Sequence, residues 1–242
     1  MRNEIGSNES WWESIFEHRR WVEVGAVKLP TMIIDVWSDV VCPWCFIGKR
    51  RLEKALSLFE HRDEVVIRHR AFQLQPEITT TVATKSYLAE KYRMAEAQVE
   101  EMQANVCAIA DGEGLCYNLD ETLSGNTFDA HRLLLWAATL DKQDELLEAM
   151  YSAYFEKSQP LFSHVDLIKV CALAGINSED VTALLVSNQF NEEVIGDREL
   201  ASQLGATGVP FFVIDMKYGI SGAQSLEAFT QTLNTAWQEA QG

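Results

Sequence analysis

The sequence predicts an α/β fold in which one sheet-forming domain is interrupted by a long helical segment. An apolar, β-branched run at 32–41 is followed by a helical pattern and by a second strand-like run, which is a β-α-β order. Strand signals are absent over 76–189, where apolar residues recur at helical spacing. They return near the C-terminus in the order α-β-β-α, so strands from the two ends of the chain are expected to share one sheet.

Composition limits the classes of partner. The chain has 242 residues, 47% of them hydrophobic, with 7 Trp and 11 Phe, which suffices for a substantial core. Lys and Arg number 20 against 36 Asp and Glu, a net charge of −16 that repels phosphates and argues against nucleic acid. No apolar run approaches the length of a membrane span, so no membrane partner is expected. A homodimer is compatible with the sequence.

Residues 1–30 are predicted to be an N-terminal extension of unknown role. They lack the apolar core and the small-residue cleavage site of a secretory signal. The chain has 5 cysteines, an odd number at irregular spacing, which does not suit a secreted disulfide framework. We therefore expect a cytoplasmic protein. Because the glutathione pool there is reducing, the direction of electron flow stays open.

The first part of the sheet domain is expected at 31–75. The strand at 32–41 leads into a helix in which Leu52, Ala55, Leu56 and Phe59 recur at helical spacing. A second strand is predicted at 64–72, parallel to the first, which completes a βαβ unit.

The segment 76–189 is expected to be an inserted all-helical domain. Its Pro and Gly residues separate the helical patterns from one another. The patterns lie at 86–93, 96–111, 127–140, 143–156, 165–174 and 178–187.

The second part of the sheet domain is expected at 190–242. A helix over 192–204 stops at Gly205, and a hydrophobic strand follows at 207–214. A turn leads into a short strand at 218–220, and apolar residues at helical spacing then mark a final helix.

Cys42-Pro43-Trp44-Cys45 is the motif that carries chemistry, because it stands at the junction of the first strand and its helix. Unpaired N–H groups and the helix dipole at that position favour the thiolate of Cys42, which is the nucleophilic form in disulfide exchange. Cys45 lies one turn further along, where it can resolve a mixed disulfide. Pro43 suits the first turn because it lacks an N–H and its φ is near the helical value.

The C-x-x-C motif has two other interpretations. Half of a zinc site is disfavoured because Cys107, Cys116 and Cys171 are single cysteines without a second C-x-x-C or H-x3-H, so no metal is expected. A structural disulfide across one helical turn closes almost no loop and therefore adds little stability. A redox pair is the prediction.

Gly208-Val209-Pro210 is the second chemical signal. Pro210 opens the most hydrophobic strand of this half, where a proline is tolerated at the first residue in either a trans or a cis peptide. The motif alone is weak evidence. Combined with the C-x-x-C motif, it predicts a cis Val209–Pro210 bond that faces Cys42.

With these motifs, the chain resembles the DsbA-like branch of the thioredoxin superfamily, and within it the FrnE-type subgroup. The matching segments are IIDVWSD (33–39), CPWCFIGK (42–49), RAFQL (70–74), NTFDAHRLL (126–134), GATGVPFFV (205–213) and ISGAQ (220–224). The resemblance implies a thioredoxin fold with an inserted all-helical domain. It also implies a thiol–disulfide oxidoreductase or isomerase, with Cys42 as nucleophile and Cys45 as resolving thiol.

The resemblance also indicates substrate-binding residues and partners. The candidates are Pro43, Trp44, Val209, Pro210, Asn126 and His131. His131 is either a packing residue or a group that contacts substrate or handles a proton. The expected partners are protein or small-molecule thiols and disulfides. No cofactor is expected, and glutathione is a candidate substrate or electron donor.

Two alternative functions stay open. Kappa-class glutathione transferases and 2-hydroxychromene-2-carboxylate isomerases resemble the same architecture but normally carry Ser at the position of Cys42. They often have an Asp-Arg pair after the last hairpin, where this chain has Gly222-Ala223-Gln224-Ser225. A glutathione-dependent isomerase or transferase is therefore the second enzyme hypothesis. A redox-linked chaperone is the other alternative, because the insert and the Trp-rich N-terminus could bind unfolded chains.

Overall fold

The computed structural model describes residues 21–24, 27–30 and 32–241, with the backbone alone for the first two ranges. Strands β1 (Trp21–Val24) and β2 (Val27–Pro30) form an antiparallel pair. Residues 1–20, most of the predicted N-terminal extension, lie outside the described part, so the role of that extension stays open.

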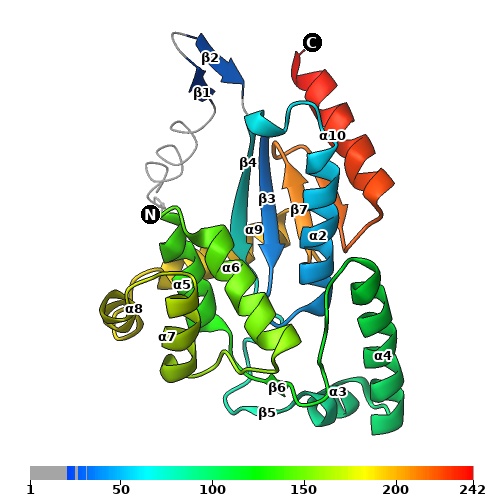
Figure 1. Ribbon diagram of the computed structural model, residues 1–242, viewed down its shortest axis with the longest axis vertical. Coiled ribbons are helices and arrows are strands. Elements are labelled where there is room, and N and C mark those ends of the chain that lie inside the picture. Colours follow the sequence, from blue (N-terminus) through cyan, green and yellow to red (C-terminus); the bar gives the residue numbers. More distant parts are fainter. Residues whose placement is uncertain (1–20, 25–26, 31, 242) are drawn as a thin grey trace, which may run out of the picture.

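Four strands from two distant parts of the chain form one sheet in the order β4-β3-β7-β8 (Figure 1). β3 (Met32–Ser38) pairs in parallel with β4 (Val65–Ala71), as predicted for a βαβ unit. β7 (Phe211–Ile214) pairs antiparallel with β3 and with β8 (Tyr218–Ser221). The predicted α/β fold with a shared sheet is confirmed.

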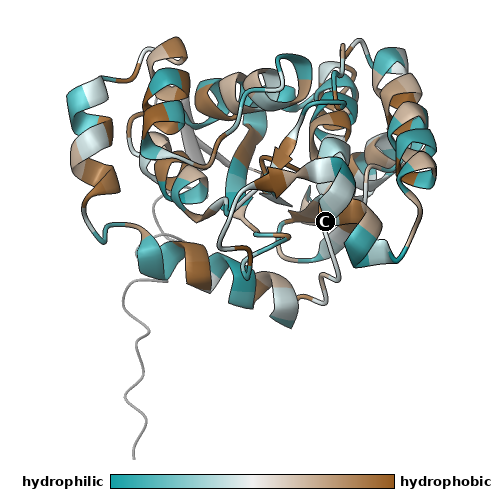
Figure 2. Ribbon diagram, turned by 90° about the horizontal axis from the view of Figure 1, so that it is seen from below, coloured by the Kyte–Doolittle hydropathy of each residue, from teal (hydrophilic) through white to brown (hydrophobic). Residues whose placement is uncertain are grey.

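Helices cover both faces of this sheet. α2 (Pro43–Ser57) and α10 (Leu226–Gln241) lie on one face, and α9 (Asn191–Gln203) lies behind it (Figure 1). Along β3, Ile34 and Val36 pack with the α2 and α10 core, whereas Trp37 belongs to a cluster with residues of α9. This alternation follows from the two-residue period of a strand. Figure 2 shows the apolar strands at the centre and helices whose apolar and polar bands alternate.

Helices fill the chain between β4 and α9, as expected. They are α3 (Thr84–Tyr92), α4 (Glu96–Gly112), α5 (Phe128–Ala138), α6 (Gln143–Tyr151), α7 (His164–Leu173) and α8 (Ser178–Leu185), and a short 3-10 helix, η1 (Arg62–Glu64), precedes β4.

The insert departs from the prediction at two places. β5 (Val82–Ala83) pairs with β6 (Leu123–Ser124), although no strand was expected there. Strands of two residues are too short to leave an alternating pattern in the sequence. The helix predicted over 143–156 changes at Ser152 into a π-helix, η2 (Ser152–Glu156), which carries two aromatic residues of the core.

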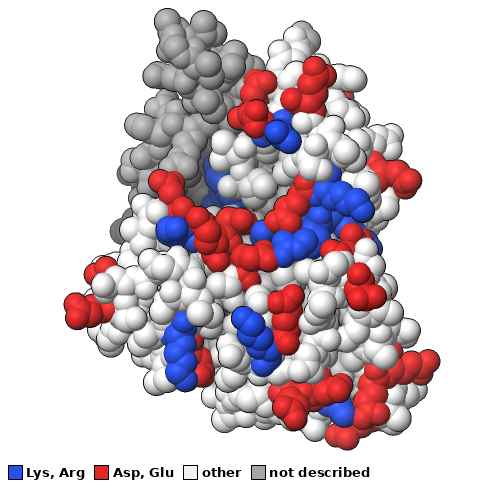
Figure 3. Space-filling model, viewed as in Figure 1, with Lys and Arg blue, Asp and Glu red and all other residues white. Residues whose placement is uncertain are grey.

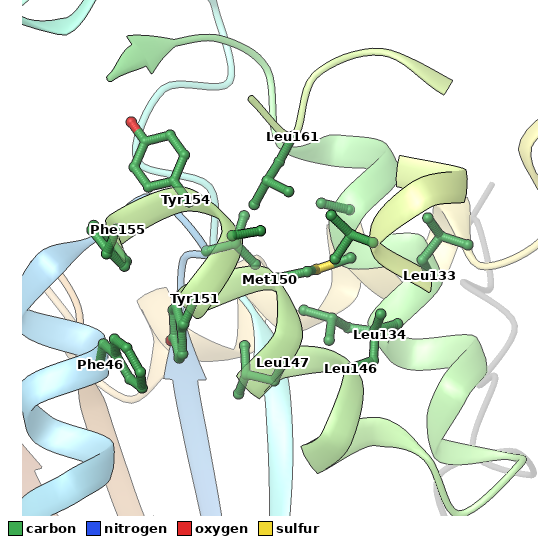
Figure 4. Packing of buried hydrophobic residues seen from close by; sticks show 14 of the residues in the cluster. Phe46, Leu133, Leu134, Leu146, Leu147, Met150, Tyr151, Tyr154, Phe155 and Leu161 are labelled. Atoms are coloured by element: carbon green, nitrogen blue, oxygen red, sulfur yellow. The ribbon is translucent and has the colours of Figure 1, made fainter. Parts of the chain in front are cut away.

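The largest core cluster joins the insert to the start of α2. Phe46 of α2 stacks on Tyr151 and lies 6.2 Å from the ring of Phe155, both from the segment α6–η2 (Figure 4). Cys42 and Cys45 belong to the same cluster. Because this core contains residues from both sides of position 76, the division at 31–75, 76–189 and 190–242 stays a prediction.

Ion pairs connect α2 to α6 at the surface. Lys49, whose side chain is 7% exposed, lies 3.1 Å from Asp144 and 3.2 Å from Glu148 and also pairs with Glu53. Arg50 pairs with Glu53 and Glu148. Acidic and basic side chains alternate across the middle of this face, where α6 meets α2 (Figure 3). The insert is thus attached to the helix that carries both cysteines.

Candidate active site

The backbone places Cys42 at the N-terminus of α2. It is the N-cap residue, with φ −92° and ψ 111°, and Pro43 occupies the first turn as predicted. The N–H of Cys42 donates to the carbonyl oxygen of Asp39 at 3.1 Å, which closes the turn between β3 and α2. No side chain caps this helix end, so its free N–H groups remain available to the Cys42 sulfur.

Cys45 lies on the first turn of α2, inside the core. Both cysteines are free thiols, and Cys45 is 2% exposed. Burial raises the pKa of Cys45 well above its usual range, and the hydrogen bond with the Cys42 thiol raises it further. Cys45 therefore stays protonated at neutral pH and needs a base before it can attack.

Val209 and Pro210 lie against the motif, as the sequence predicts. The Val209–Pro210 peptide bond is cis, and the Cys42 thiol lies 3.6 Å from the carbonyl oxygen of Val209. Gly48 makes this approach of α2 feasible, because a Cβ there would lie 3.0 Å from Cγ of Pro210 and 3.1 Å from Phe212. Because Gly48 has no side chain, α2 packs directly against Pro210 and the segment just before β7, which we call the Pro210 loop.

A cavity of about 490 Å³ opens beside Cys42. Of the predicted site residues, Cys42, Pro43, Trp44 and Val209 line it together. The other wall comes from residues of α3, α4 and η2, so the cavity lies between the sheet domain and the insert. A second hollow of about 350 Å³ shares Trp44 with it. Trp44, 37% exposed, therefore contributes to both spaces.

The structure does not place His131 and Asn126 on the wall of this cavity. His131, on α5, is 2% exposed, and its Nε2 lies 3.3 Å from Oδ1 of Asp39 without hydrogen-bond alignment. At this distance a protonated His131 ring would form an ion pair with the Asp39 carboxylate. Asn126 instead accepts hydrogen bonds from Gln73 and from the N–H of Phe128, and donates to the carbonyl oxygens of Pro76 and Ile78. It joins the segment after β4 to the start of α5.

Asp39 is a site residue that the motif analysis did not single out. Its side chain is fully buried, and its Oδ2 accepts a 2.7 Å hydrogen bond from the N–H of Leu74. The charge of its carboxylate raises the pKa of the Cys45 thiol, whereas a hydrogen bond with the Asp39 backbone lowers that pKa by more. The signal available in the sequence was an acidic residue directly between the apolar strand and the C-x-x-C motif. Acidic side chains are rarely buried unless they have a partner.

Tyr117 is a second such residue, and no sequence signal marks it. Its hydroxyl donates a 2.7 Å hydrogen bond to the carbonyl oxygen of Pro43. Its ring stacks on Phe46 and Phe155, and burial raises the pKa of Tyr117 above its usual range. A residue of the insert thus holds the first turn of α2.

The remaining cysteines lie apart from the cavity lining. Burial raises the pKa of Cys171 to about 12 and also raises that of Cys107, so neither is an activated thiol. Within residues 32–241, no three His, Cys, Asp or Glu side chains gather in a way that would hold a metal ion. None of the helices described is both long and apolar enough to cross a membrane.

Comparison with known proteins gives one family match and one distant curated relative. The family model described as "DSBA-like thioredoxin domain" matches residues 33–234. The uncharacterized protein YwbO of Bacillus subtilis is 21% identical over 206 residues, which cover 84% of this chain and 96% of YwbO.

Solved structures with similar folds include a probable DsbA oxidoreductase from Streptomyces coelicolor. That protein is 42% identical, with a TM-score of 0.83, over 86% of this chain and 91% of its own. The cytosolic disulfide reductase DsbM of Pseudomonas aeruginosa is 16% identical, with a TM-score of 0.60, over 85% and 98% of the two chains. A 2-hydroxychromene-2-carboxylate isomerase is 14% identical, with a TM-score of 0.61, over 86% and 97%. The last two share the fold alone.

Proposed function

This chain belongs to the family of DSBA-like thioredoxin domains, and on that premise we propose that it is a thiol–disulfide oxidoreductase or isomerase that works through Cys42 and Cys45. One observation carries the proposal: Cys42 caps α2 on the wall of a cavity, with its thiol 3.6 Å from the Val209 carbonyl oxygen. Cys45 is buried one turn further along. The FrnE-type subgroup stays a prediction.

The exchange takes two steps. The Cys42 thiolate attacks one sulfur of a substrate disulfide, forms a mixed disulfide with it and releases the other half as a thiolate. Cys45 then loses its proton and attacks the Cys42 sulfur, which forms the Cys42–Cys45 disulfide and releases the second half. The substrate gains two electrons and the protein loses two. The reverse sequence oxidises a dithiol.

The second step needs a proton acceptor, because burial and Cys42 raise the pKa of Cys45. We assign this role to Asp39 together with His131. Asp39 is the carboxylate near Cys45, and His131 lies 3.3 Å from its Oδ1. His131 would then act by positioning Asp39 rather than by touching the substrate, since it lies outside the cavity lining.

Trapping of the intermediate tests the proposal. Cys45→Ala removes the resolving thiol, so mixed disulfides should accumulate on Cys42 and appear as high-mass adducts on non-reducing gels. Cys42→Ala should give none, because no first attack occurs. Cys171→Ala, a change at a buried thiol outside the cavity lining, is the control and should behave as the unmodified protein. Equal trapping by both site variants would contradict the assigned order of attack.

Variants of the two site cysteines also distinguish the proposed function from its two alternatives. A glutathione-dependent isomerase or transferase would need no second thiol, so Cys45→Ala would retain its full turnover. A redox-linked chaperone would keep its holdase activity in a variant lacking both site cysteines. Glutathione stays a candidate electron donor within the proposed function. A cytoplasmic setting also belongs to this proposal, supported by the fold shared with the cytosolic reductase DsbM.

A further inference from the structure

The cavity beside Cys42 has a wall that disulfide exchange by itself does not require. Its volume of about 490 Å³ lies in the range of sites for small molecules. Apolar side chains from both parts of the fold dominate it, among them Leu74, Leu88, Met102, Val106, Leu119 and Phe155. A ligand that reaches Cys42 can therefore place an apolar group against this wall.

The carbonyl oxygens of two amide side chains on the same wall lack a hydrogen-bond donor. Gln103, on α4, is 7% exposed, and its buried Oε1 accepts no hydrogen bond from the described residues. The buried Oε1 of Gln75 also accepts no hydrogen bond from the described residues. An unpaired buried polar group costs free energy comparable to a lost hydrogen bond. When either amide turns toward the cavity, a ligand with an N–H donor can satisfy its oxygen.

Lys91, on α3, supplies a local positive charge. It is the only charged side chain among the described residues that line the cavity, and it is exposed to solvent. Its ammonium lies 5.5 Å from the ring centroid of Tyr87 and 5.8 Å from that of Tyr92. In a chain with a net charge of −16, this exposed ammonium at the mouth of the cavity supplies a local attraction for an anion.

We propose that the cavity selects a low-molecular-weight disulfide whose half contains an apolar group, an amide N–H and a free carboxylate, as in a short cysteinyl peptide. The inference rests on the proposed exchange at Cys42 and names its substrate class. The sulfur meets Cys42, the apolar group lies on the wall, an amide N–H donates to Gln103, and the carboxylate pairs with Lys91. Reduced protein and one peptide disulfide give the Cys42–Cys45 disulfide and two peptide thiols.

A small ligand fits these features better than a protein segment does. The hydrogen-bonding and charged groups lie within one cavity, so a single ligand must present an apolar group, a donor and an anion close to its sulfur. A short peptide ending near its cysteine carries its carboxylate there, whereas an internal protein segment continues past that point. A segment of an unfolded protein is the competing occupant that the experiment tests.

The test compares disulfide-linked dimers of three peptides: N-acetyl-Cys-Phe, its C-terminal amide, and N-acetyl-Cys-Gly. The rate constant for oxidation of the full reduced chain is followed by acid quenching and mass spectrometry. We expect the Phe acid to react about tenfold faster than the Gly acid, because a Phe side chain is buried. We expect it to react about threefold faster than the Phe amide, because an exposed ion pair is lost.

Two variants assign these preferences to residues. Lys91→Gln should reduce the acid-to-amide ratio to near one, whereas the control Lys169→Gln, on the exposed surface of α7, should leave it unchanged. Gln103→Leu, of similar size, should slow both Phe peptides several-fold. Urea unfolding of each variant checks that it is folded, and the ratios within one variant remain informative even if its stability falls.

The failures of the inference and of the proposed function are distinguishable. Hydroxyethyl disulfide, which is small and neutral, reports exchange at Cys42 without the cavity. If it oxidises the protein and the three peptides react equally, the inference is wrong and the proposed function stands. If no disulfide oxidises the Cys42–Cys45 pair, the proposed function is wrong. Faster reaction of an unfolded protein disulfide than of the Phe acid, unaffected by Lys91→Gln, would assign the cavity to protein segments and overturn the inference.

Discussion

The hydroxyl of Tyr117 donates a 2.7 Å hydrogen bond to the carbonyl oxygen of Pro43, so a residue of the insert contacts the C-x-x-C motif directly. Pro43 lies in the first turn of α2, next to Cys42. The insert therefore stabilises the helix end at which Cys42 lies, besides forming one wall of the cavity.

Tyr117→Phe tests this contact. The ring and its stacking on Phe46 and Phe155 are retained, and only the hydrogen bond is lost, so the free energy of unfolding should fall by about 1 kcal/mol. Tyr154→Phe is the comparison variant: its side chain lines the same cavity, but its hydroxyl donates its 2.7 Å hydrogen bond to the carbonyl oxygen of Leu123 and not to the motif. Urea unfolding should show similar losses for both, and only Tyr117→Phe should change the alkylation rate of Cys42. An unchanged rate would limit Tyr117 to a packing role.

Alkylation should distinguish the two cysteines. Cys42 lines the cavity, whereas Cys45 is absent from its lining and has a raised pKa because of burial. We expect iodoacetamide to modify Cys42 in the folded reduced protein between about pH 6 and 8, and Cys45 only after unfolding. Peptide mapping by mass spectrometry measures both sites in one sample. Faster labelling of Cys45 would reverse the assignment of nucleophile and resolving thiol.

Gly48→Ala should push the Pro210 loop away from α2. Alanine is favoured over glycine inside a helix by about 1 kcal/mol, but here its Cβ would lie 3.0 Å from Pro210. We expect a net loss of stability and slower disulfide exchange, since the Val209 carbonyl oxygen would move relative to Cys42.

Gly196→Ala is the control for this change. Gly196 lies inside α9, and a Cβ there meets nothing within 4 Å, so the substitution should raise stability by about 0.5–1 kcal/mol. Thermal and urea unfolding compare the two variants. Equal stabilisation by both would show that α2 and the Pro210 loop adapt freely.

Asp144 should make stability depend on pH. A hydrogen bond with His69, and then the charge of Lys49, hold the pKa of Asp144 well below its usual range. In the unfolded chain its pKa is about 3.9, so its contribution is complete above about pH 5 and is lost as the pH falls below that unfolded value. Asp144→Asn should lower stability at pH 7 and reduce the loss between about pH 5 and 2. The effect should stay below about 1 kcal/mol, because the side chain is 65% exposed.

Asp141→Asn is the matched control for the charge. Asp141 lies just before α6, whose first turn contains Asp144, and has a positive φ of 53°, a conformation that asparagine also adopts readily. Its substitution should leave the pH dependence unchanged in urea titrations. If both variants follow the same pH profile as the unmodified chain, the ion pairs between α2 and α6 do not contribute measurably to stability.

Local patterns predicted most of the elements. The strand period at β3, the helical spacing in α2 and α10, and the glycines that end α7 and α9 each depend on neighbouring residues alone. The β5–β6 pair and the π-helix were missed, because both depend on partners far away in the sequence. The same applies to Asn126 and His131. The sequence identified their segment, but the Asn126 side chain contacts Gln73 and the His131 side chain lies beside Asp39, so neither lines the cavity.

By itself, the sequence determined the order of the elements, the position of the C-x-x-C motif at a strand–helix junction, and the proline that opens β7. These are properties of short segments, where propensity and spacing act over a few residues. Only the tertiary structure decided which groups surround Cys42. The burial of Cys45, the proximity of Asp39 and His131, the contact of Tyr117 with Pro43, and the cavity with Lys91 and Gln103 all arise from packing between segments that lie far apart in the sequence. Burial and proximity then set the pKa values and the charges that the chemistry uses.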